Sequence, residues 1–236
     1  MHISKKILVV LAGSALAATM ASCGGGGGAG STSGDTLTVG IKYDQPGLGQ
    51  KVGEDYKGLD VDVAKYVAKE LGFEGDKVIF KETPSAQRET AIQGGQVGLI
   101  FATYSITDAR KEKVSFAGPY FVAGQDLLVK ADNSDITGPE TMKDKTLCSV
   151  TGSTPAEKIK KEYATTVKLF EQDTYSKCVE ALVGGTVDAV TTDNVILAGF
   201  AAQPQYAGKL KVVGKPFSTE RYGVGLKKGD VELCNK

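Results

Sequence analysis

Ser105 and Arg110 are the residues whose types and spacing best suit the binding of an anion. They follow residues 97–101, an apolar run typical of a buried strand, and Arg110 comes five residues after Ser105. A guanidinium offers a carboxylate two parallel N–H donors, and a hydroxyl and backbone N–H groups can add further hydrogen bonds. The alternative interpretation is a capped helix start followed by a solvated arginine.

An acidic residue, Asp193, follows a second apolar run at residues 189–190. Arg110 and Asp193 together suit a zwitterion such as an α-amino acid, which carries one carboxylate and one ammonium. Burying either charge unpaired costs several kcal/mol, so a selective site needs a fixed cation and a fixed anion. If the two residues lie in separate lobes, only a closed form satisfies both ends of the ligand, and the ligand favours closure.

The sequence offers little for catalysis. Its single histidine, His2, lies in a segment that we expect to be removed, so the mature chain has no Ser-His-Asp set, no Cys-His pair and no histidine metal ligand. A P-loop motif for a nucleotide phosphate is also absent from the sequence. Acid–base chemistry by carboxylates stays open, but no pair is singled out. We therefore expect a protein that is not an enzyme and that has no metal and no cofactor.

The composition describes an ordinary globular protein. Hydrophobic residues make up 41% and charged residues 24% of the 236 residues, which provides for an ample core. The length allows one large domain or two small ones. Because 28 basic residues balance 28 acidic ones, there is no electrostatic case for binding nucleic acid.

Residues 1–22 have the pattern of a secretory signal peptide. Lys5 and Lys6 precede an apolar run that is shorter than the ~20 residues of a membrane span. Residues 20–23 (MASC) resemble a bacterial lipobox, although Met20 stands where leucine is usual, and Cys23 would become the lipidated first residue. The alternative is an ordinary secretory signal with an incidental cysteine.

The Gly/Ser-rich residues 23–34 then form a flexible tether with a reach of roughly 18 Å. We expect an extracytoplasmic lipoprotein that is attached to the cell membrane through its lipid anchor only.

Export places the other cysteines, Cys148, Cys178 and Cys234, in an oxidising compartment. With Cys23 acylated, three remain, so one of them is left over. We expect Cys148 to pair with Cys178, which closes a loop of about 31 residues and stabilises the fold by roughly 3–4 kcal/mol in the chain-entropy model. The pairing state of Cys234 stays open.

Strand and helix patterns alternate along the chain, which favours a mainly parallel sheet covered by helices. The predicted strands are at residues 36–41, 77–82 and 97–101, and the predicted helices are at residues 60–71 and 87–93. Residues 91–100 are echoed by residues 181–190, each with a helix, a Gly-Gly pair and a buried strand before a polar cluster. The echo suggests two lobes that share a crevice at the carboxyl ends of their sheets.

We place the first lobe at residues 35–122 plus 219–236 and the second at residues 123–218. Predicted crossing strands at residues 126–130 and 222–227 join them. Two crossings favour hinge closure over free tumbling of the lobes.

From residue 36 to residue 230 the chain resembles the extracytoplasmic amino-acid-binding proteins, the family 3 solute-binding proteins of ABC transporters. The motifs that carry the resemblance are residues 102–110 (ATYSITDAR), 116–121 (FAGPYF), 40–49 (GIKYDQPGLG) and 58–64 (GLDVDVA). The last two are similar to the glutamate/aspartate-type branch.

The resemblance implies a two-lobed, periplasmic-binding-protein-like (type II) α/β fold. Each lobe is a mainly parallel sheet flanked by helices, with two crossing strands at the hinge. The family normally ends with one or two further helices on the first lobe, so we expect this chain to be a fragment without its C-terminal helix.

The resemblance also implies roles for individual residues. Thr103 gives a carbonyl and a hydroxyl to the ligand ammonium, and Asp193 pairs with that ammonium. Ser105 and Arg110 hold the α-carboxylate. Residues 151–154 (TGST) resemble a turn of the second lobe that caps the same carboxylate, which implicates Ser153 and Thr154. Helix capping by Ser153 or Thr154 is a compatible alternative.

Lys42 and Arg88 match the positions that face an acidic ligand side chain, and Gln45 is a further polar contact. A solvated surface arginine is the alternative for Arg88. We predict a monomeric receptor that captures glutamate, with glutamine or aspartate next, and delivers it to the permease subunits of an ABC transporter. The alternatives are an exported dehydratase-like enzyme on the same fold and a ligand-sensing module.

Overall fold

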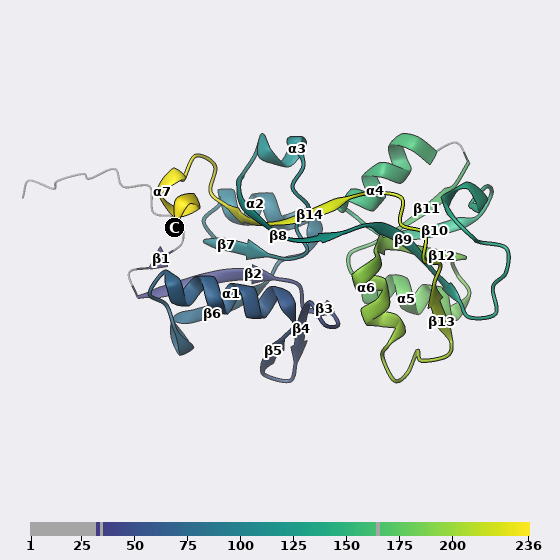
Figure 1. The fold of residues 1–236 in the computed structure, drawn as a ribbon, viewed down its shortest axis with the longest axis horizontal. Coiled ribbons are helices and arrows are strands. Elements are labelled where there is room, and N and C mark those ends of the chain that lie inside the picture. The colour runs from purple at the N-terminus through teal and green to yellow at the C-terminus, as the bar shows by residue number, and fades with distance from the viewer. Residues whose placement is uncertain (1–31, 34, 164–165) are drawn as a thin grey trace, which may run out of the picture.

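The computed structural model describes residues 32–33, 35–163 and 166–236. The predicted signal peptide, the predicted lipidation site at Cys23 and most of the predicted tether lie outside the described residues. Thr32–Ser33, at the end of that tether, instead form strand β1 and pair with β2. Two lobes lie side by side, and the chain passes between them twice, from β8 to β9 and from β13 to β14 (Figure 1). In the described part of the chain, every helix is too short or too polar to cross a membrane.

The first lobe is built on a six-stranded sheet. Its strands are β1, β2 (Thr36–Ile41), β6 (Val78–Glu82), β7 (Leu99–Phe101), β8 (Ser115–Ala123) and β14 (Glu220–Leu226). β2 pairs in parallel with β6 and β7, whereas β14 runs antiparallel between β7 and β8. The sheet is therefore mixed rather than mainly parallel as predicted, because the strand that returns from the other lobe enters it in the opposite direction.

The second lobe repeats this arrangement with a five-stranded sheet. Its strands, in spatial order, are β11 (Lys168–Gln172), β10 (Thr146–Val150), β12 (Ala189–Asp193), β9 (Gln125–Lys130) and β13 (Leu210–Val212). β10 is parallel to β11 and β12, and β9 is antiparallel to β12 and β13. The residues that echo one another form α2 and β7 in the first lobe and α5 and β12 in the second.

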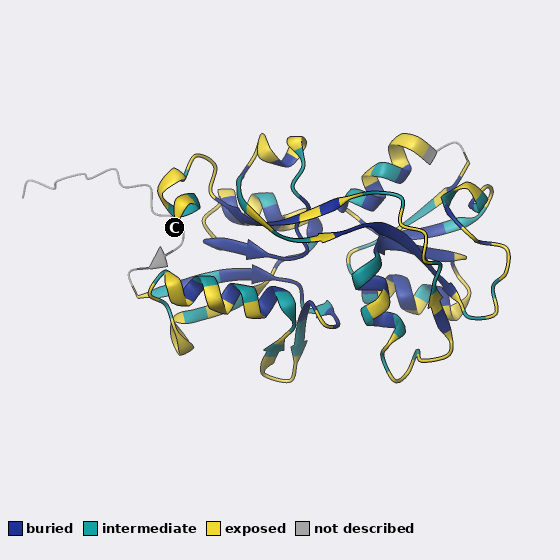
Figure 2. Ribbon diagram, viewed as in Figure 1, coloured by how far each residue is buried: buried dark blue, intermediate teal, exposed yellow. Residues whose placement is uncertain are grey.

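Helices cover the sheets, and the strands hold more of the buried residues than the helices do (Figure 2). The α-helices are α1 (Leu59–Glu70), α2 (Arg88–Gln93), α3 (Asp108–Lys111), α4 (Thr154–Lys158), α5 (Tyr175–Gly184), α6 (Asn194–Ala201) and α7 (Val231–Asn235). Single turns of 3-10 helix lie at Gly75–Lys77, Ser85–Gln87 and Pro139–Thr141, and a π-helical turn at Ile159–Tyr163 continues α4. Leu233 and Cys234 of α7 pack against the core of the first lobe. The lobe boundaries given above, and the status of the chain as a fragment, stay predictions.

A disulfide joins Cys148 on β10 to Cys178 on α5, as the sequence predicted. Both cysteines belong to the apolar core of the second lobe, with Val190 and Leu182 as neighbours in the same cluster. The bond therefore ties a central strand to the helix that covers it. Cys234 has no disulfide partner among the described residues.

A small three-stranded sheet of the first lobe contacts the second lobe. It consists of β3 (Asp44–Gln45), β4 (Gly49–Val52) and β5 (Asp55–Lys57). Leu48, in the turn between β3 and β4, packs into the core cluster of the second lobe. Asp44 Oδ2 accepts hydrogen bonds from Ser176 N (3.0 Å) and Ser176 Oγ (3.1 Å) in the first turn of α5. These contacts hold the two lobes together away from the hinge.

Glycine at position 199 lets α6 approach this turn closely. A Cβ atom there would lie 2.3 Å from the carbonyl oxygen of Pro46. The lobes can therefore meet at this point only because α6 presents bare backbone.

Candidate functional site

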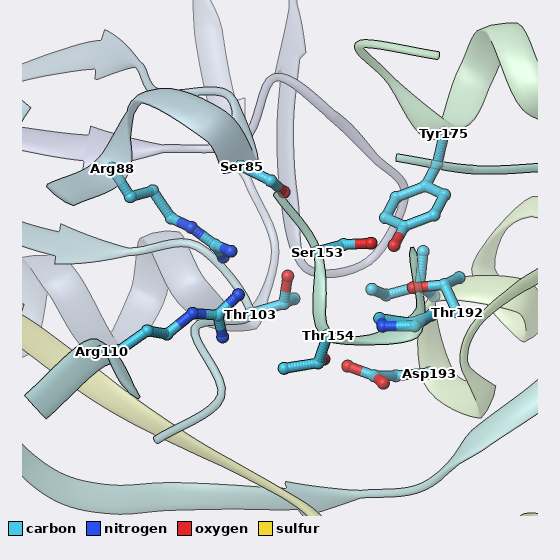
Figure 3. A pocket seen from close by; sticks show the side chains of 11 residues that line it. Ser85, Arg88, Thr103, Arg110, Ser153, Thr154, Tyr175, Thr192 and Asp193 are labelled. Carbon is cyan, nitrogen blue, oxygen red and sulfur yellow. The ribbon is translucent and has the colours of Figure 1, made fainter. Parts of the chain in front are cut away.

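A pocket of polar character lies between the two lobes, near the carboxyl ends of β7 and β12 (Figure 3). It contains about 230 Å³ of empty space, its open mouth included. The lining residues from the first lobe are Ser85, Arg88, Thr103 and Arg110, and those from the second are Ser153, Thr154, Pro155, Tyr175, Thr192, Asp193 and Ile196. Six of the nine predicted ligand contacts are in this set: Arg88, Thr103, Arg110, Ser153, Thr154 and Asp193.

Arg110 is held from three sides and is only 8% exposed. It lies on α3, whose first turn is capped by the Thr107 hydroxyl accepting from Arg110 N (3.3 Å). Its NH1 donates to the Ser105 carbonyl (2.8 Å), its NH2 donates to the Gly152 carbonyl (3.0 Å), and its Nε lies 3.5 Å from Glu89 Oε1. The helix cap of the alternative interpretation is therefore present, but Arg110 is buried and not solvated. Each terminal nitrogen carries two hydrogens, so both keep one for a ligand carboxylate.

Arg88 is also a buried cation, with 2% of its surface exposed. Its NH1 donates to the Ala102 carbonyl (3.0 Å), and its guanidinium carbon lies 4.2 Å from the centre of the Tyr104 ring. The solvated arginine that was the alternative here is therefore wrong. Burial and the nearby Arg110 lower the Arg88 pKa to about 10, which leaves the side chain charged at neutral pH. Its Nε is buried without a partner among the described residues.

Three of the predicted ligand contacts lie one layer behind the pocket wall. The Lys42 ammonium donates to Ser85 Oγ (2.8 Å), and Gln45 Oε1 accepts from the Thr103 hydroxyl (3.1 Å). Ser105 reaches Arg110 through its backbone carbonyl. These three residues therefore support side chains that line the pocket: Ser85, Thr103 and Arg110.

Lys42 is 5% exposed, and its environment disfavours its charge. Burial, followed by repulsion from Arg88, lowers the Lys42 pKa to about 7. Asp44 and Glu82 act in the opposite direction and raise the Lys42 pKa. The charge behind Ser85 therefore depends on pH in the physiological range.

Thr103 adopts a backbone conformation that β-branched residues rarely take, with φ of 45°. Asp60 holds it there, because its Oδ2 accepts from Thr103 N (2.9 Å) while its Oδ1 accepts from the Tyr120 hydroxyl (2.7 Å). Burial raises the Asp60 pKa to about 6, although both hydrogen bonds oppose that rise. The sequence analysis did not single out Asp60. Its position in the first turn of α1, inside the motif at residues 58–64, gave no sign that it would be buried.

The turn before α4 closes over the pocket from the second lobe. The Gly152 carbonyl accepts from Arg110 NH2 and lies 3.5 Å from Arg88 NH2. Gly152 has φ of 76°, and a Cβ atom on it would lie 2.8 Å from the Cα of Ala86, so only glycine fits this approach. Ser153 Oγ caps α4 by accepting from Ala156 N (3.2 Å). Ser153 therefore both caps α4 and lines the pocket.

Asp193 faces the two arginines across the pocket (Figure 3). It is 3% exposed, its Oδ2 accepts from the Tyr222 hydroxyl (2.6 Å), and its Oδ1 is buried without a partner among the described residues. Burial raises the Asp193 pKa to about 7 and Glu220 adds to that rise, whereas the Tyr222 hydrogen bond and Arg110 lower it. The pocket thus offers one free carboxylate oxygen opposite two guanidinium groups.

A hydrogen-bond network joins the hinge to this pocket. Glu220 Oε1 accepts from Gln125 Nε2 (2.8 Å) and from Ser218 Oγ (2.8 Å), and Glu220 Oε2 accepts from the Thr154 hydroxyl (3.1 Å). Glu220 lies on the crossing strand β14, and Gln125 on the crossing strand β9. Thr154 is thereby fixed by the hinge as well as by its place at the start of α4.

Three polar residues of the pocket wall were not predicted from the sequence: Ser85, Tyr175 and Thr192. Thr192 stands next to Asp193 on β12 and belongs to a polar cluster after an apolar run, which is the one usable signal. Tyr175 begins α5 and Ser85 lies in a 3-10 turn, and neither position differs in sequence from an ordinary helix start.

Comparison with known proteins identifies the family. The family of bacterial extracellular solute-binding proteins, family 3, matches residues 37–236. The chain belongs to this family. It is similar to the glutamate-binding protein GluB of Corynebacterium efficiens, with 49% identity over 237 residues, 96% of this chain and 80% of that protein. It is also similar to the glutamine-binding protein of Geobacillus stearothermophilus, with 38% identity over 84% of this chain and 75% of that protein.

Among solved structures, an ancestral arginine-binding protein bound to glutamine has a TM-score of 0.79 to this chain. The two are 37% identical, and the match covers 85% of this chain and 88% of that one. The predicted two-lobed type II fold is thus confirmed. The chain is an extracytoplasmic amino-acid-binding protein of the ABC transporter class and not an enzyme, which sets the dehydratase-like alternative aside.

Proposed function

We propose that this solute-binding protein is a receptor for L-glutamate. The observation that carries the proposal is the charge pattern of the pocket wall, where two arginines, Arg88 and Arg110, face one aspartate, Asp193. L-Glutamate brings two carboxylates and one ammonium, so each charge of the ligand meets an opposite charge. Glutamine has a single carboxylate and leaves one buried guanidinium without an anion, which costs affinity.

We assign each residue a role that is supported by its place in the pocket. Arg110 binds the α-carboxylate, assisted from the opposite lobe by the Ser153 hydroxyl and the Thr154 backbone N–H, because the Thr154 hydroxyl already donates to Glu220. Asp193 Oδ1 binds the ammonium, with Thr103 beside it. Arg88 binds the side-chain carboxylate. Such charge-assisted hydrogen bonds are about twice as strong as neutral ones.

Ser85 and Lys42 complete the part of the site that receives the ligand side chain. The Ser85 hydroxyl lines the pocket and accepts a hydrogen bond from the Lys42 ammonium behind it. Gln45 supports the ammonium end of the site through Thr103. Because the polar groups come from both lobes, ligand binding and lobe closure favour each other.

The relatives support the same substrate class. The relative with 49% identity is a glutamate-binding protein, and the relative with 38% identity is a glutamine-binding protein. We therefore rank glutamate first and glutamine second.

The cellular part of the proposal goes beyond the pocket. The protein acts as a monomer, is anchored to the cell membrane through a lipid on Cys23 after removal of residues 1–22, and delivers its ligand to the permease subunits of an ABC transporter. The family supports an extracytoplasmic receptor of this class, and the MASC motif supports the anchor.

A thermal-shift screen of the twenty amino acids on the chain without residues 1–22 tests the proposed ligand. Binding to the folded state alone raises the apparent stability, so the strongest ligand gives the largest rise in Tm. We expect glutamate to give the largest rise and glutamine or aspartate the next. A screen in which glutamate gives no rise, or in which a cationic amino acid ranks first, would remove glutamate as the substrate.

A further inference from the structure

Tyr222 connects the two halves of the site without lining the pocket. It lies on the crossing strand β14, is fully buried, and donates from its hydroxyl to Asp193 Oδ2 at 2.6 Å. Its backbone forms an antiparallel bridge with Ser105, and the neighbouring Gly223 N donates to the Tyr104 carbonyl (3.0 Å). One residue thus contacts both the segment that leads to Arg110 and the carboxylate of the other lobe.

The ring of Tyr222 cannot move freely. It stacks on Phe121, with ring centres 5.7 Å apart and planes inclined by 29°, and it lies 6.3 Å from the ring centre of Tyr120. β14 pairs with β8 through this region, so the ring is fixed to the sheet of the first lobe. The hydroxyl is therefore presented to Asp193 from a rigid position.

The effect on Asp193 is directional. With Oδ2 occupied by the Tyr222 hydroxyl, Oδ1 is left without a partner among the described residues, and Figure 3 shows the carboxylate facing the pocket. We propose that Tyr222 is a positioning residue, whose hydroxyl holds one oxygen of Asp193 so that the other meets the ligand ammonium. This inference rests on the proposed amino-acid site and adds a residue to it that makes no ligand contact of its own.

The electrostatic surroundings of Asp193 give the inference a measurable consequence. Burial and Glu220 on β14 disfavour its ionised form, whereas the Tyr222 hydroxyl, Arg110 on α3 and Arg88 on α2 favour it. Tyr175 on α5 also faces the carboxylate, and its own pKa is raised to about 12 chiefly by burial. Because the Asp193 pKa is already about 7, the loss of a hydrogen-bond donor raises this pKa above neutral pH. Removing a hydrogen bond to a charged group raises a carboxyl pKa by about one to two.

Tyr222→Phe tests the inference, because it removes the hydroxyl and keeps the ring contacts with Phe121 and Tyr120. Only ionised Asp193 pairs with the ligand ammonium, so we expect glutamate affinity to fall about tenfold at pH 7 and less than about twofold at pH 9. Calorimetry on wild type and variant at each pH gives the ratio. The titrations of Lys42 and of the ligand ammonium are common to both proteins, so they cancel in this ratio of affinities.

Two further measurements separate positioning from a general loss of structure. In an Asp193→Asn background, Tyr222→Phe should change glutamate affinity by less than about twofold, since residues that act through one another are not additive. Carboxyl ¹³C NMR of the ligand-free protein should show a higher Asp193 pKa in Tyr222→Phe. Tyr120→Phe is the matched control, because it removes a similar buried hydroxyl from Asp60 and should leave the Asp193 pKa unchanged.

An affinity loss that is equal at pH 7 and pH 9, or equally large in the Asp193→Asn background, overturns the inference. So does an Asp193 pKa that is the same in Tyr222→Phe and wild type. Failure of the proposed function gives a different result, because the wild-type protein would then not bind glutamate or would bind another amino acid more tightly. The NMR titration needs no ligand and decides the role of Tyr222 in either case.

Discussion

Raising the pH from 7 to 9 should weaken glutamate binding and spare glutamine binding. Lys42 causes the difference, because burial and Arg88 lower its pKa to about 7 and its ammonium is then largely neutral at pH 9. Its Nζ lies 2.8 Å from Ser85 Oγ, and Ser85 lines the pocket where we place the ligand side chain. Glutamate loses a cation opposite its side-chain carboxylate, whereas the neutral amide of glutamine has no such charge to pair.

The size of the effect follows from Coulomb's law. Two unit charges separated by one intervening hydroxyl, at about 5–6 Å, attract by about 3 kcal/mol at an effective dielectric constant of 20. A bound carboxylate therefore raises the Lys42 pKa by at most about two, and by about one if water enters the site. Between pH 7 and pH 9 these limits correspond to an affinity loss of about five- to thirtyfold relative to glutamine.

Calorimetric titrations with glutamate and with glutamine at pH 7, 8 and 9 measure this ratio directly. Ionisation of Asp193 and of the ligand ammonium affects both ligands alike, so the ratio isolates Lys42. Lys42→Met is the matched control, because it keeps a long apolar side chain and removes the charge. It should bind glutamate weakly at pH 7 and show a ratio that does not change with pH. If the wild-type ratio is the same at pH 7 and pH 9, Lys42 does not act on the ligand side chain.

Arg110→Ala should weaken glutamate binding by roughly 2–5 kcal/mol, about 1.5 to 3.5 decades, because the ligand carboxylate loses its charge partner; unchanged affinity by calorimetry would place Arg110 outside the site. Asp44→Ala should weaken glutamate binding about five- to thirtyfold, although Asp44 does not line the pocket, because the change removes two charge-assisted hydrogen bonds between the lobes. Equal affinity of variant and wild type would show that lobe closure does not depend on these bonds. Replacing both Cys148 and Cys178 by alanine should lower the free energy of unfolding by roughly 3–4 kcal/mol; a denaturant midpoint equal to that of the wild type would contradict this.

The sequence was sufficient to bring Arg110 and Asp193 to one pocket. Arg110 lies on α3, the first α-helix after β7, and Asp193 is the last residue of β12, and the carboxyl ends of such strands meet at a crevice. One disulfide was expected from the number of cysteines and the compartment, and the pair chosen from the three, Cys148 and Cys178, is confirmed.

Other features depend on contacts between distant segments and left no local pattern. β8 was not predicted as a strand, because Gly118 and Pro119 interrupt the alternation of its residues, but an edge strand tolerates both. Lys42 was placed in direct contact with ligand, but the structure shows its ammonium bound to Ser85, and Ser85 lines the pocket in its place. Asp60 is hydrogen-bonded to Thr103, 43 positions away in the chain, and Tyr222 to Asp193, 29 positions away. A pattern of neighbouring residues does not encode such contacts.

A crystal structure of the protein with L-glutamate would show how the ligand lies between Arg110 and Asp193. We expect the α-carboxylate within hydrogen-bond distance of the Arg110 terminal nitrogens and the ammonium within hydrogen-bond distance of Asp193 Oδ1, with the side-chain carboxylate against Arg88. A glutamate molecule bound in any other orientation, or outside the pocket between the lobes, would contradict this expectation.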